Sequence, residues 1–514
     1  MAETKEEKRE TKEVYKTRAD YILSLESDKW LFYADVLVDK AHVVMLEERD
    51  IIRREEAADI LRCLIEIEKR GEDFIEHELP SYEDVHTAIE SVLIREIKDT
   101  GGRMHTGRSR NDEVATCIRI ALRDELLQLM KEVNGLRIGL IEKAAENVDT
   151  VMPGYTHLQH AQPTTFAHHF SAHADAFSRD FSRLIGAYEH TNINPLGAAA
   201  FASTGFPLDR ARTAKLLGFD AVLENSMDAV STRDFIIETI SCFSNIVTNL
   251  SRLAEEIILW STSEFDFIHL PAEYTTGSSI MPQKRNPDFA ELVRARAGTV
   301  YGCLMSTLSI CKALPYSYNR DLQEVTSHLL KATKTTASSV VVMKSIVDGL
   351  KPKKEEMEKK ARIGFTTATE LADTIVRETG ISFRTAHKIV SSLASALANE
   401  KQEAGISIKG EKTDEAFVEE TFRRIDDFAT DIIGRKLSEL GLTEEKVGEA
   451  MNVTSNIEKR DLKGGPAKKE VQRMIQKRKR DLEKDEKAIQ EKEERVKKSL
   501  QELERRIAGI VGEE

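Results

Sequence analysis

Residues 275–287 read TTGSSIMPQKRNP and lie between two segments, 235–267 and 289–311, whose apolar residues recur at three- and four-residue spacing. That spacing predicts two long helices joined by this stretch. Its two prolines block helical propagation, so the stretch forms a loop, and Gly277 allows backbone conformations closed to other residues. Hydroxyl, amide and basic side chains gathered in a loop between helices suit an anionic ligand. A plain surface connection is the alternative.

The segment from Asp228 to Phe267 follows one continuous apolar stripe and predicts a single very long helix. At about 1.5 Å of rise per residue, several such helices of about 40 Å or more imply an extended bundle. Strand-like alternation is nearly absent, and long apolar stripes need partners. We therefore expect an all-α fold with a central long-helix bundle and subunits packed side by side. The stripe consists of Phe235, Ile236, Ile240, Phe243, Val247, Leu250, Leu253 and Ile257.

Composition divides the 514 residues into four predicted parts. The first two are an N-terminal helical domain (1–111) and a central long-helix bundle domain (112–351). Shorter helices then predict a small C-terminal helical domain (352–463). The boundary Gly464-Gly465-Pro466 opens a charged helical tail (464–514).

The charged tail keeps one apolar residue at every seventh position. The second apolar position of the heptad is mostly charged until Leu500 and Ile507, so the stripe is narrow. A narrow stripe is typical of a long exposed helix or a weak coiled coil. A binding surface for a partner is the functional alternative. The stripe consists of Ile475, Leu482, Ile489, Val496, Leu503 and Ile510.

The formal net charge of −13 argues against general nucleic-acid binding, so an anionic ligand needs a locally basic site. No apolar run approaches the roughly 18 residues that a membrane span needs. The five cysteines include no Cys-x-x-Cys pair, and with no recognisable signal peptide they favour a reducing cytoplasm. The sequence thus indicates a cytoplasmic protein that binds neither nucleic acid nor membranes.

Two further loops break the helical pattern. Residues 101–112 are rich in glycine and arginine and run into a long helix, with Asn111 or Asp112 as the expected N-cap. Arginines ahead of a helix amino terminus form a good anion site. Residues 152–163 interrupt the pattern again. In a bundle, or across neighbouring subunits, these two loops and residues 275–287 can converge.

Three histidines, His168, His169 and His173, lie on the helix that follows the second of these loops. Neither an acidic residue nor a cysteine in the pattern completes a set of metal ligands around them. We therefore expect packed or solvated histidines and no metal site.

Together the three loops offer arginine, lysine, histidine, amide and hydroxyl side chains, without a cysteine nucleophile or a phosphate-binding loop. Arginine holds carboxylates with two hydrogen bonds, histidine transfers protons near neutral pH, and lysine with loop amides stabilises charge developing on a carboxylate. This inventory suits acid–base chemistry on a small polycarboxylate. By residue type alone His157 would be the base, because an unperturbed serine is far too weak.

The sequence GSSIMPQKRNP at 277–287 closely resembles the signature loop of the fumarase/aspartase superfamily of lyases. Gln283, directly before the lysine, resembles the argininosuccinate lyase branch. Adenylosuccinate lyases typically have histidine there, and fumarases and aspartases glycine. The resemblance covers roughly residues 21–474. Other segments similar to the same branch are 104–112, 155–159, 225–229 and 318–324.

This resemblance implies reversible cleavage of argininosuccinate to arginine and fumarate, the last step of arginine biosynthesis, without a cofactor. It also implies a homotetramer with a central helical bundle and active sites shared by three subunits. The reaction is an anti elimination. A base removes a proton from the carbon next to a carboxylate, and an acid assists departure of the guanidino nitrogen.

Residue roles also follow from the resemblance. It implies that Ser278 is the base and His157 the acid, so Ser278 needs activation by loop amides and Lys284. His86, near the start of a helix, is implied to bind a carboxylate. Contacts to substrate are implied for Ser24, Asn111, Thr156, Tyr318 and Gln323, with Arg110, Lys284 and Asn286 around the carboxylates.

Two departures from the family pattern stand out. Thr326 occupies the position where many members have a lysine, so the contact to the arginine-derived carboxylate needs another residue. The charged tail runs well beyond the common family length. Two other functions are the alternatives: another fumarate-releasing lyase of the superfamily, such as adenylosuccinate lyase, or a non-catalytic structural protein on the same scaffold, as in lens crystallins.

Overall fold

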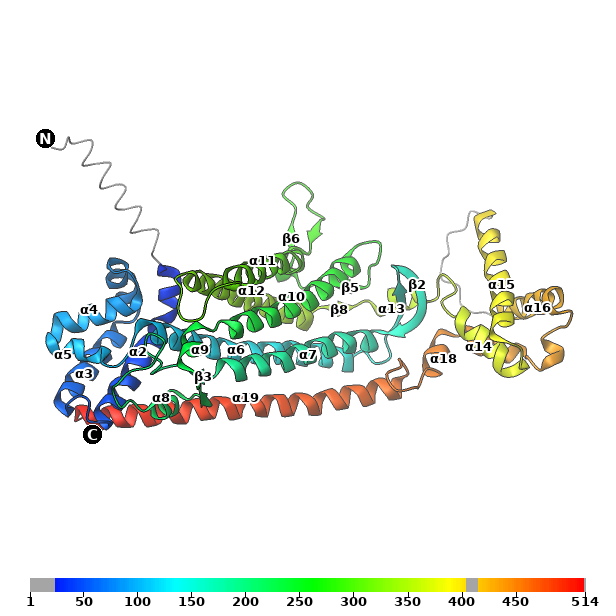
Figure 1. Cartoon of the computed structure of the whole chain (residues 1–514). Helices are drawn as coiled ribbons and strands as arrows, with labels where there is room; N and C mark the ends of the chain where they lie inside the picture. Colours follow the sequence, from blue (N-terminus) through cyan, green and yellow to red (C-terminus); the bar gives the residue numbers. More distant parts are fainter. Residues whose placement is uncertain (1–23, 404–414, 513–514) are drawn as a thin grey trace.

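A computed structural model describes residues 24–403 and 415–512 (Figure 1). This part of the chain is built from helices, and its strands form four two-stranded pairs. The prediction of an all-α fold is confirmed. In the described residues no helix is both long enough and apolar enough to cross a membrane.

Five long helices lie side by side and form the central bundle (Figure 1). Helix α10 packs on α11 and α7, and α6 packs on α7 and α12. The apolar stripe of α10 lies in the core, where Phe235, Ile240 and Leu250 are buried. The helices are α6 (Arg110–Ala145), α7 (Phe166–Thr191), α10 (Asp234–Ser261), α11 (Asp288–Cys311) and α12 (Asp321–Gly349).

Shorter helices cover one end of the bundle, where α2 packs on α3, α4, α6 and α8. They are α2 (Leu25–Glu48), α3 (Arg54–Arg70), α4 (Val85–Ile97), α5 (Asp99–Gly102), α8 (Arg210–Leu217) and α9 (Ser226–Ser231). The prediction of a single helix over 228–267 is wrong, because the extended backbone of Thr232 separates α9 from α10 and that of Thr262 ends α10.

The short strands connect helices at loops and turns. Strands β1 (Val151–Thr156) and β2 (Gln159–Thr165) form an antiparallel hairpin, and β3 (Ile193–Asn194) pairs with β4 (Ala221–Val222) in parallel. The remaining antiparallel pairs are β5 (Ile268–His269) with β8 (Lys351–Pro352), and β6 (Thr276–Gly277) with β7 (Arg285–Asn286).

A group of smaller helices beyond the bundle has an apolar core of its own, which includes Leu371, Ile389 and Ile425. A separate apolar core is typical of an independent folding unit. The helices are α13 (Lys354–Ala361), α14 (Ala368–Thr379), α15 (Phe383–Glu403), α16 (Glu415–Ile433), α17 (Glu444–Met451) and α18 (Val453–Glu458), of which α13 packs against β1.

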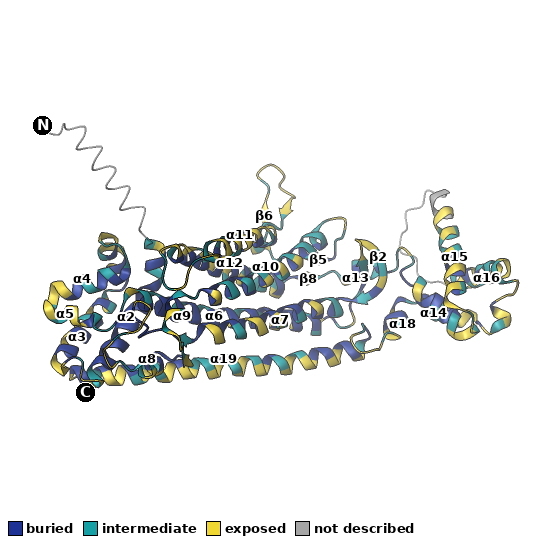
Figure 2. Ribbon diagram, in the orientation of Figure 1, coloured by how far each residue is buried: buried dark blue, intermediate teal, exposed yellow. Residues whose placement is uncertain are grey.

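Helix α19 (Lys468–Val511) is the charged tail, and it runs back along the whole bundle to end beside α3 (Figure 1). The stripe predicts an exposed helix or a weak coiled coil, but the structure packs it on α6, α3, α8 and α2. Every apolar residue that recurs at seven-residue spacing along α19 is buried, while exposed residues lie along the outer side of the helix (Figure 2). A partner could therefore reach only that outer, charged side.

Ion pairs flank the buried stripe of α19. Arg137 of α6 is 2.7 Å from Asp485, and Arg212 of α8 is 2.5 Å from Glu502. Arg478 also pairs with Asp175 of α7. The narrow stripe suffices because the bundle supplies the other apolar surface, which the sequence of the tail alone did not reveal.

Replacing Leu503 by alanine is expected to destabilise the protein by about 2–5 kcal/mol, because the side chain is fully buried between α19 and the bundle. Chemical denaturation measures this. The exposed Lys498→Ala is the matched control on the same helix, with an expected change within about 0.5 kcal/mol. Equal, small changes in both variants would contradict the observed packing.

Candidate active site

A pocket of about 310 Å³ lies where α2, α4, the start of α6 and the start of α12 meet. Polar and charged side chains dominate its wall, which suits a small, charged ligand. It is lined by six of the predicted site residues: Ser24, His86, Arg110, Asn111, Tyr318 and Gln323. Asp28, Asp84, Arg233, Arg320 and Thr326 also line it, and sequence reasoning had not assigned the first four to the site.

The start of α6 places Arg110 and Asn111 in this pocket. Ser109 is the N-cap rather than the predicted Asn111 or Asp112: its side-chain oxygen accepts from the Asn111 amide at 3.3 Å, and Asp112 accepts from the Ser109 amide at 3.0 Å. This reciprocal pair is a capping box, whose signature S-x-x-E/Q has Asp112 in place of Glu. Asp112 also accepts from the amides of Gly197 and Ala199, which fixes the loop 195–205 against α6.

His86 is buried beside two acidic residues. Its Nδ1 is 2.8 Å from an oxygen of Asp35 and 3.8 Å from one of Glu113. Burial opposes the charged imidazole, but the charge and hydrogen bond of Asp35 outweigh it and raise the pKa of His86 to about 10. The imidazole of His86 is therefore protonated at the pocket wall, and its role in binding a carboxylate stays a prediction.

This ion pair links stability to pH. The pKa of His86 is raised from about 6.5 to about 10. The contribution of the ion pair to the free energy of unfolding is therefore complete below pH 6.5 and disappears as pH rises through 10. We expect the difference in unfolding midpoint between the protein and Asp35→Asn to shrink across that window. Thermal unfolding at several pH values measures it, and a difference that grows with pH would contradict the pairing.

Ion pairs also hold two arginines of the pocket. Arg110 lies 2.8 Å from Asp84, and Arg320 lies 2.8 Å from Glu83. Ser24 donates to Asp28 at 2.8 Å. Burial raises the pKa of Asp28 to about 6, and it raises that of Tyr318 as well. The pocket therefore presents both charges to a ligand, with most of its cations already positioned by carboxylates.

Thr156 and His157 lie elsewhere, at the tip of the β1–β2 hairpin. Thr156 pairs with Gln159, so His157 and Leu158 form a two-residue turn. Both have positive φ, 56° and 57°, in the left-handed region that suits such turns but strains residues with side chains. His157 is exposed at this tip. Its strained, exposed position is typical of a functional side chain.

Residues 275–287 form an exposed hairpin through β6 and β7 that projects from the bundle (Figures 1 and 2). The side-chain oxygen of Ser278 accepts from the amides of Ile280 and Met281, at 3.2 and 3.0 Å. Lys284 donates to Asn286 at 2.5 Å. Gly277 is extended in β6, so the prediction that it adopts a backbone conformation closed to other residues is wrong. The loop amides nevertheless point at Ser278.

The helices hold these three groups of residues far apart within one subunit. Arg110 and Asn111 open α6, whose 36 residues end just before the β1–β2 hairpin. At about 1.5 Å per residue, the helix separates them from His157 by about 54 Å. Likewise, the 24 residues of α11 lie between Asn286 and the pocket, a helix about 36 Å long. One subunit thus does not join the predicted proton-transfer groups to the pocket.

The predicted histidines on α7 have a partner that the sequence did not indicate. His169 and His173 each lie 2.7 Å from the same oxygen of Glu256, which comes from α10. His168 lies 2.9 Å from the carbonyl oxygen of Gly464. Packing of α7 on α10 brings the carboxylate to the histidines, so the expectation that no acidic residue joins them is wrong. The histidines are packed and hydrogen-bonded.

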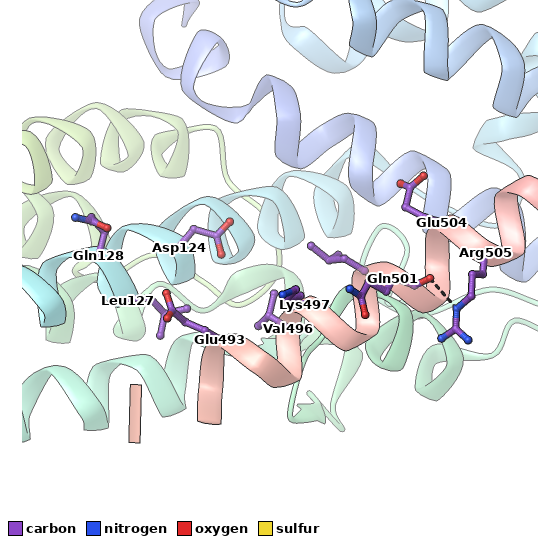
Figure 3. Close-up of a pocket in the computed structure, with 10 residues that line it drawn as sticks. Asp124, Leu127, Gln128, Glu493, Val496, Lys497, Gln501, Glu504 and Arg505 are labelled. Carbon is purple, nitrogen blue, oxygen red and sulfur yellow. Dashed lines mark hydrogen bonds between the residues drawn. The ribbon is translucent and has the colours of Figure 1, made fainter. Parts of the chain in front are cut away.

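A groove larger than this pocket is not the candidate site. It has a volume of about 710 Å³ and lies between α6 and α19 (Figure 3). Long charged side chains and a few apolar ones line it, among them Asp124, Leu127 and Lys497, and none of the predicted site residues does. The smaller pocket, by contrast, gathers groups that recognise a charged ligand.

A long-helix bundle with a GSSIMPQKRNP hairpin and a pocket of paired charges defines a lyase of the fumarase/aspartase superfamily. Family models agree: residues 8–302 match the lyase family, and residues 365–457 match the argininosuccinate lyase C-terminal family.

Individual proteins narrow the assignment. Argininosuccinate lyase from Methanococcoides burtonii is 52% identical over 89% of this chain and 89% of the relative. Argininosuccinate lyase from Methanosarcina barkeri is also 52% identical, over 90% of each chain. The solved structure of an EDDS lyase variant with bound fumarate has a TM-score of 0.82 and 31% identity, and covers 94% of this chain and 92% of that chain. The chain belongs to the argininosuccinate lyase family.

Proposed function

We propose that the protein catalyses the reversible cleavage of argininosuccinate to arginine and fumarate, in arginine biosynthesis. The relatives that share half of its residues carry that activity in their names. The observation that carries the chemistry is Ser278, whose oxygen accepts two backbone hydrogen bonds in the hairpin that also bears Lys284. Donors aimed at this oxygen favour its deprotonated form, which an isolated serine does not reach at neutral pH.

In this mechanism Ser278 removes the proton from the carbon beside a substrate carboxylate. Negative charge then develops on that carboxylate. Lys284 and Asn286 lie on the same hairpin as Ser278 and stabilise this charge. His157 protonates the departing guanidino nitrogen, with Thr156 beside it as a substrate contact. Ser24, His86, Arg110, Asn111, Tyr318 and Gln323 bind the substrate in the pocket.

The separation of these groups supports a homotetramer with shared active sites. The pocket, the β1–β2 hairpin and the Ser278 hairpin come from distant parts of one subunit (Figure 1). Neighbouring subunits in a common bundle can bring them together. Exposed apolar side chains on α11 and α12 support such packing, and they are Leu292, Tyr301, Met305, Leu308 and Val341. The five cysteines are all free, which supports a cytoplasmic enzyme.

A different substrate of the same chemical class is the second candidate, because EDDS lyase shares the fold at 31% identity. Gln283 and the higher identity to argininosuccinate lyases favour argininosuccinate. A purely structural role, the remaining alternative, would not require Ser278, His157, Lys284 and Asn286, all of which are present.

Purified protein mixed with argininosuccinate is expected to release fumarate, because the hairpin and the pocket together supply a base, an acid and carboxylate ligands. Ultraviolet absorbance of fumarate follows the reaction. Adenylosuccinate serves as the control substrate and should give no signal. Turnover of adenylosuccinate without turnover of argininosuccinate would reject the assignment.

A further inference from the structure

A cluster of three possible metal ligands lies between α7 and α10, and none of the three lines the candidate pocket. His169 and His173 are one helical turn apart on α7, so their rings lie on the same face of the helix. Both Nε2 atoms are 2.7 Å from the same oxygen of Glu256 on α10. The three ligand atoms all lie within 4.8 Å of one another. Two helices thus bring two imidazoles and a carboxylate to one point.

The side chains of this cluster are in protonation states that suit a metal ion. Burial opposes the charged carboxylate of Glu256, but the hydrogen bonds from the two histidines outweigh it and lower its pKa, so it is ionised at neutral pH. Burial lowers the pKa of His173 in spite of Glu256, so its imidazole is neutral there. A neutral imidazole has only to move its proton from Nε2 to Nδ1 to offer a lone pair to an ion.

The cluster also has room and access for an ion. Ligand atoms of a tetrahedral zinc site lie about 3.4 Å apart when the bonds are about 2.1 Å long, so Glu256 has to withdraw from its present 2.7 Å by only about 0.7 Å. His169 and Glu256 are half-buried, which leaves a path from solvent, whereas His173 is buried. The ring of Trp260 packs edge-on against His169, with centroids 5.0 Å apart, and holds its orientation.

Two other groups of possible ligands among the described residues are less suited to a metal. Both contain Asp35 and are fully buried. A cation already occupies the first group, because Arg108 lies 2.6 Å from Asp39 and 2.9 Å from Glu113. In the second group His86 pairs with Asp35 at 2.8 Å and is protonated, and a protonated imidazole has no lone pair for a metal.

We propose that His169, His173 and Glu256 bind a divalent transition-metal ion of the zinc class: Zn²⁺, Co²⁺ or Ni²⁺. Imidazole and carboxylate donors suit these ions, and two histidines with one glutamate leave a fourth position for water. The bound ion links α7 to α10 near the start of α7. The expectation of no metal site rested on the lack of an acidic partner in the sequence pattern, and α10 supplies that partner.

Titration with Co²⁺ tests the site directly, because Co²⁺ held by protein ligands absorbs visible light. Full-length protein without a polyhistidine tag is first freed of metal with a chelator and then titrated with cobalt chloride. We expect saturable binding of one ion per subunit, and displacement of Co²⁺ by Zn²⁺. Absence of saturable binding would overturn the proposal.

Substitutions of the ligands identify the site. His169→Gln and Glu256→Gln are each expected to weaken Co²⁺ binding at least about tenfold, because each removes a ligand. The matched control is His168→Gln, whose ring contacts the carbonyl oxygen of Gly464 and should leave the affinity unchanged. Both ligand variants keep all five cysteines, so an ion bound to cysteine would stay bound. Unchanged affinity in His169→Gln, or an equal loss in His168→Gln, would reject the site.

Tryptophan fluorescence locates the ion in a protein that keeps all three ligands. The chain has two tryptophans, and Trp30 lies on α2, which covers the opposite end of the bundle (Figure 1). In Trp30→Phe we expect Co²⁺ to quench the emission of Trp260, which contacts His169. In Trp260→Phe the emission of Trp30 should stay unchanged. Saturable Co²⁺ binding that leaves Trp260 unquenched, or that quenches Trp30, would overturn the proposal.

Discussion

Ser278→Ala and His157→Asn are each expected to lower turnover of argininosuccinate at least about 100-fold, the lower end of the effect of a general acid or base. Alanine removes the oxygen that accepts the amides of Ile280 and Met281, and asparagine keeps a similar size but cannot transfer a proton near neutral pH. Steady-state kinetics by fumarate absorbance measure both effects.

The matched control for the first variant is Ser279→Ala, the exposed neighbouring serine in the same hairpin. It should retain most of the turnover, because the amide hydrogen bonds converge on Ser278. Near-normal rates in both Ser278→Ala and His157→Asn would remove the mechanism. A strong loss in Ser279→Ala alone would move the base by one residue.

Mixed oligomers are expected to regain activity that their inactive components lack. Co-expression of Ser278→Ala with Arg110→Leu should give hybrid enzyme far more active than either variant alone. The reason is distance: the hairpin and the pocket of one subunit lie at different places along helices about 36–54 Å long. A site assembled from different subunits can then receive an intact hairpin from one chain and an intact pocket from the other.

A pair of substitutions in one hairpin provides the control. Ser278→Ala and Lys284→Ala lie on the same β6–β7 hairpin, so every site receives one defective hairpin and activity should not recover. Purification of hybrids with two different tags, followed by the fumarate assay, distinguishes the cases. Equal recovery of activity in both mixtures would contradict a site that takes its complete β6–β7 hairpin from a single subunit. Absence of recovery in the first mixture would place the complete site within one subunit.

The sequence predicted most of the fold because the long helices carry uninterrupted apolar stripes. The α10 stripe is an example: its period identified a long helix, although the predicted bounds 228–267 missed the break at Thr232 and the end at Ser261. The partner of the α19 stripe was not predictable, because a narrow stripe pairs equally well with another copy of itself or with the bundle. Only the three-dimensional fit of α19 against α6 and α8 resolves this.

The site was predicted unevenly for a similar reason. Motifs identified Ser278 and His157, whose local turns the structure shows in detail, although the roles stay predictions. Residue chemistry alone chose His157 as base, because sequence does not show that backbone amides converge on Ser278. Arg233 was missed, although it directly precedes the α10 helix, since its position in the pocket wall is a property of packing. The same holds for Glu256 beside His169.

Helix α19 also has a consequence for the order in which the protein matures on the ribosome. It follows in the sequence every described element on which it packs, and its final turns contact α3 near the opposite end of the chain. Contacts of such long sequence separation form slowly and late. During synthesis the apolar strip on α6, α8 and α3 therefore stays open to water until α19 emerges. We infer that nascent chains are most prone to aggregate, and most dependent on chaperones, during this interval.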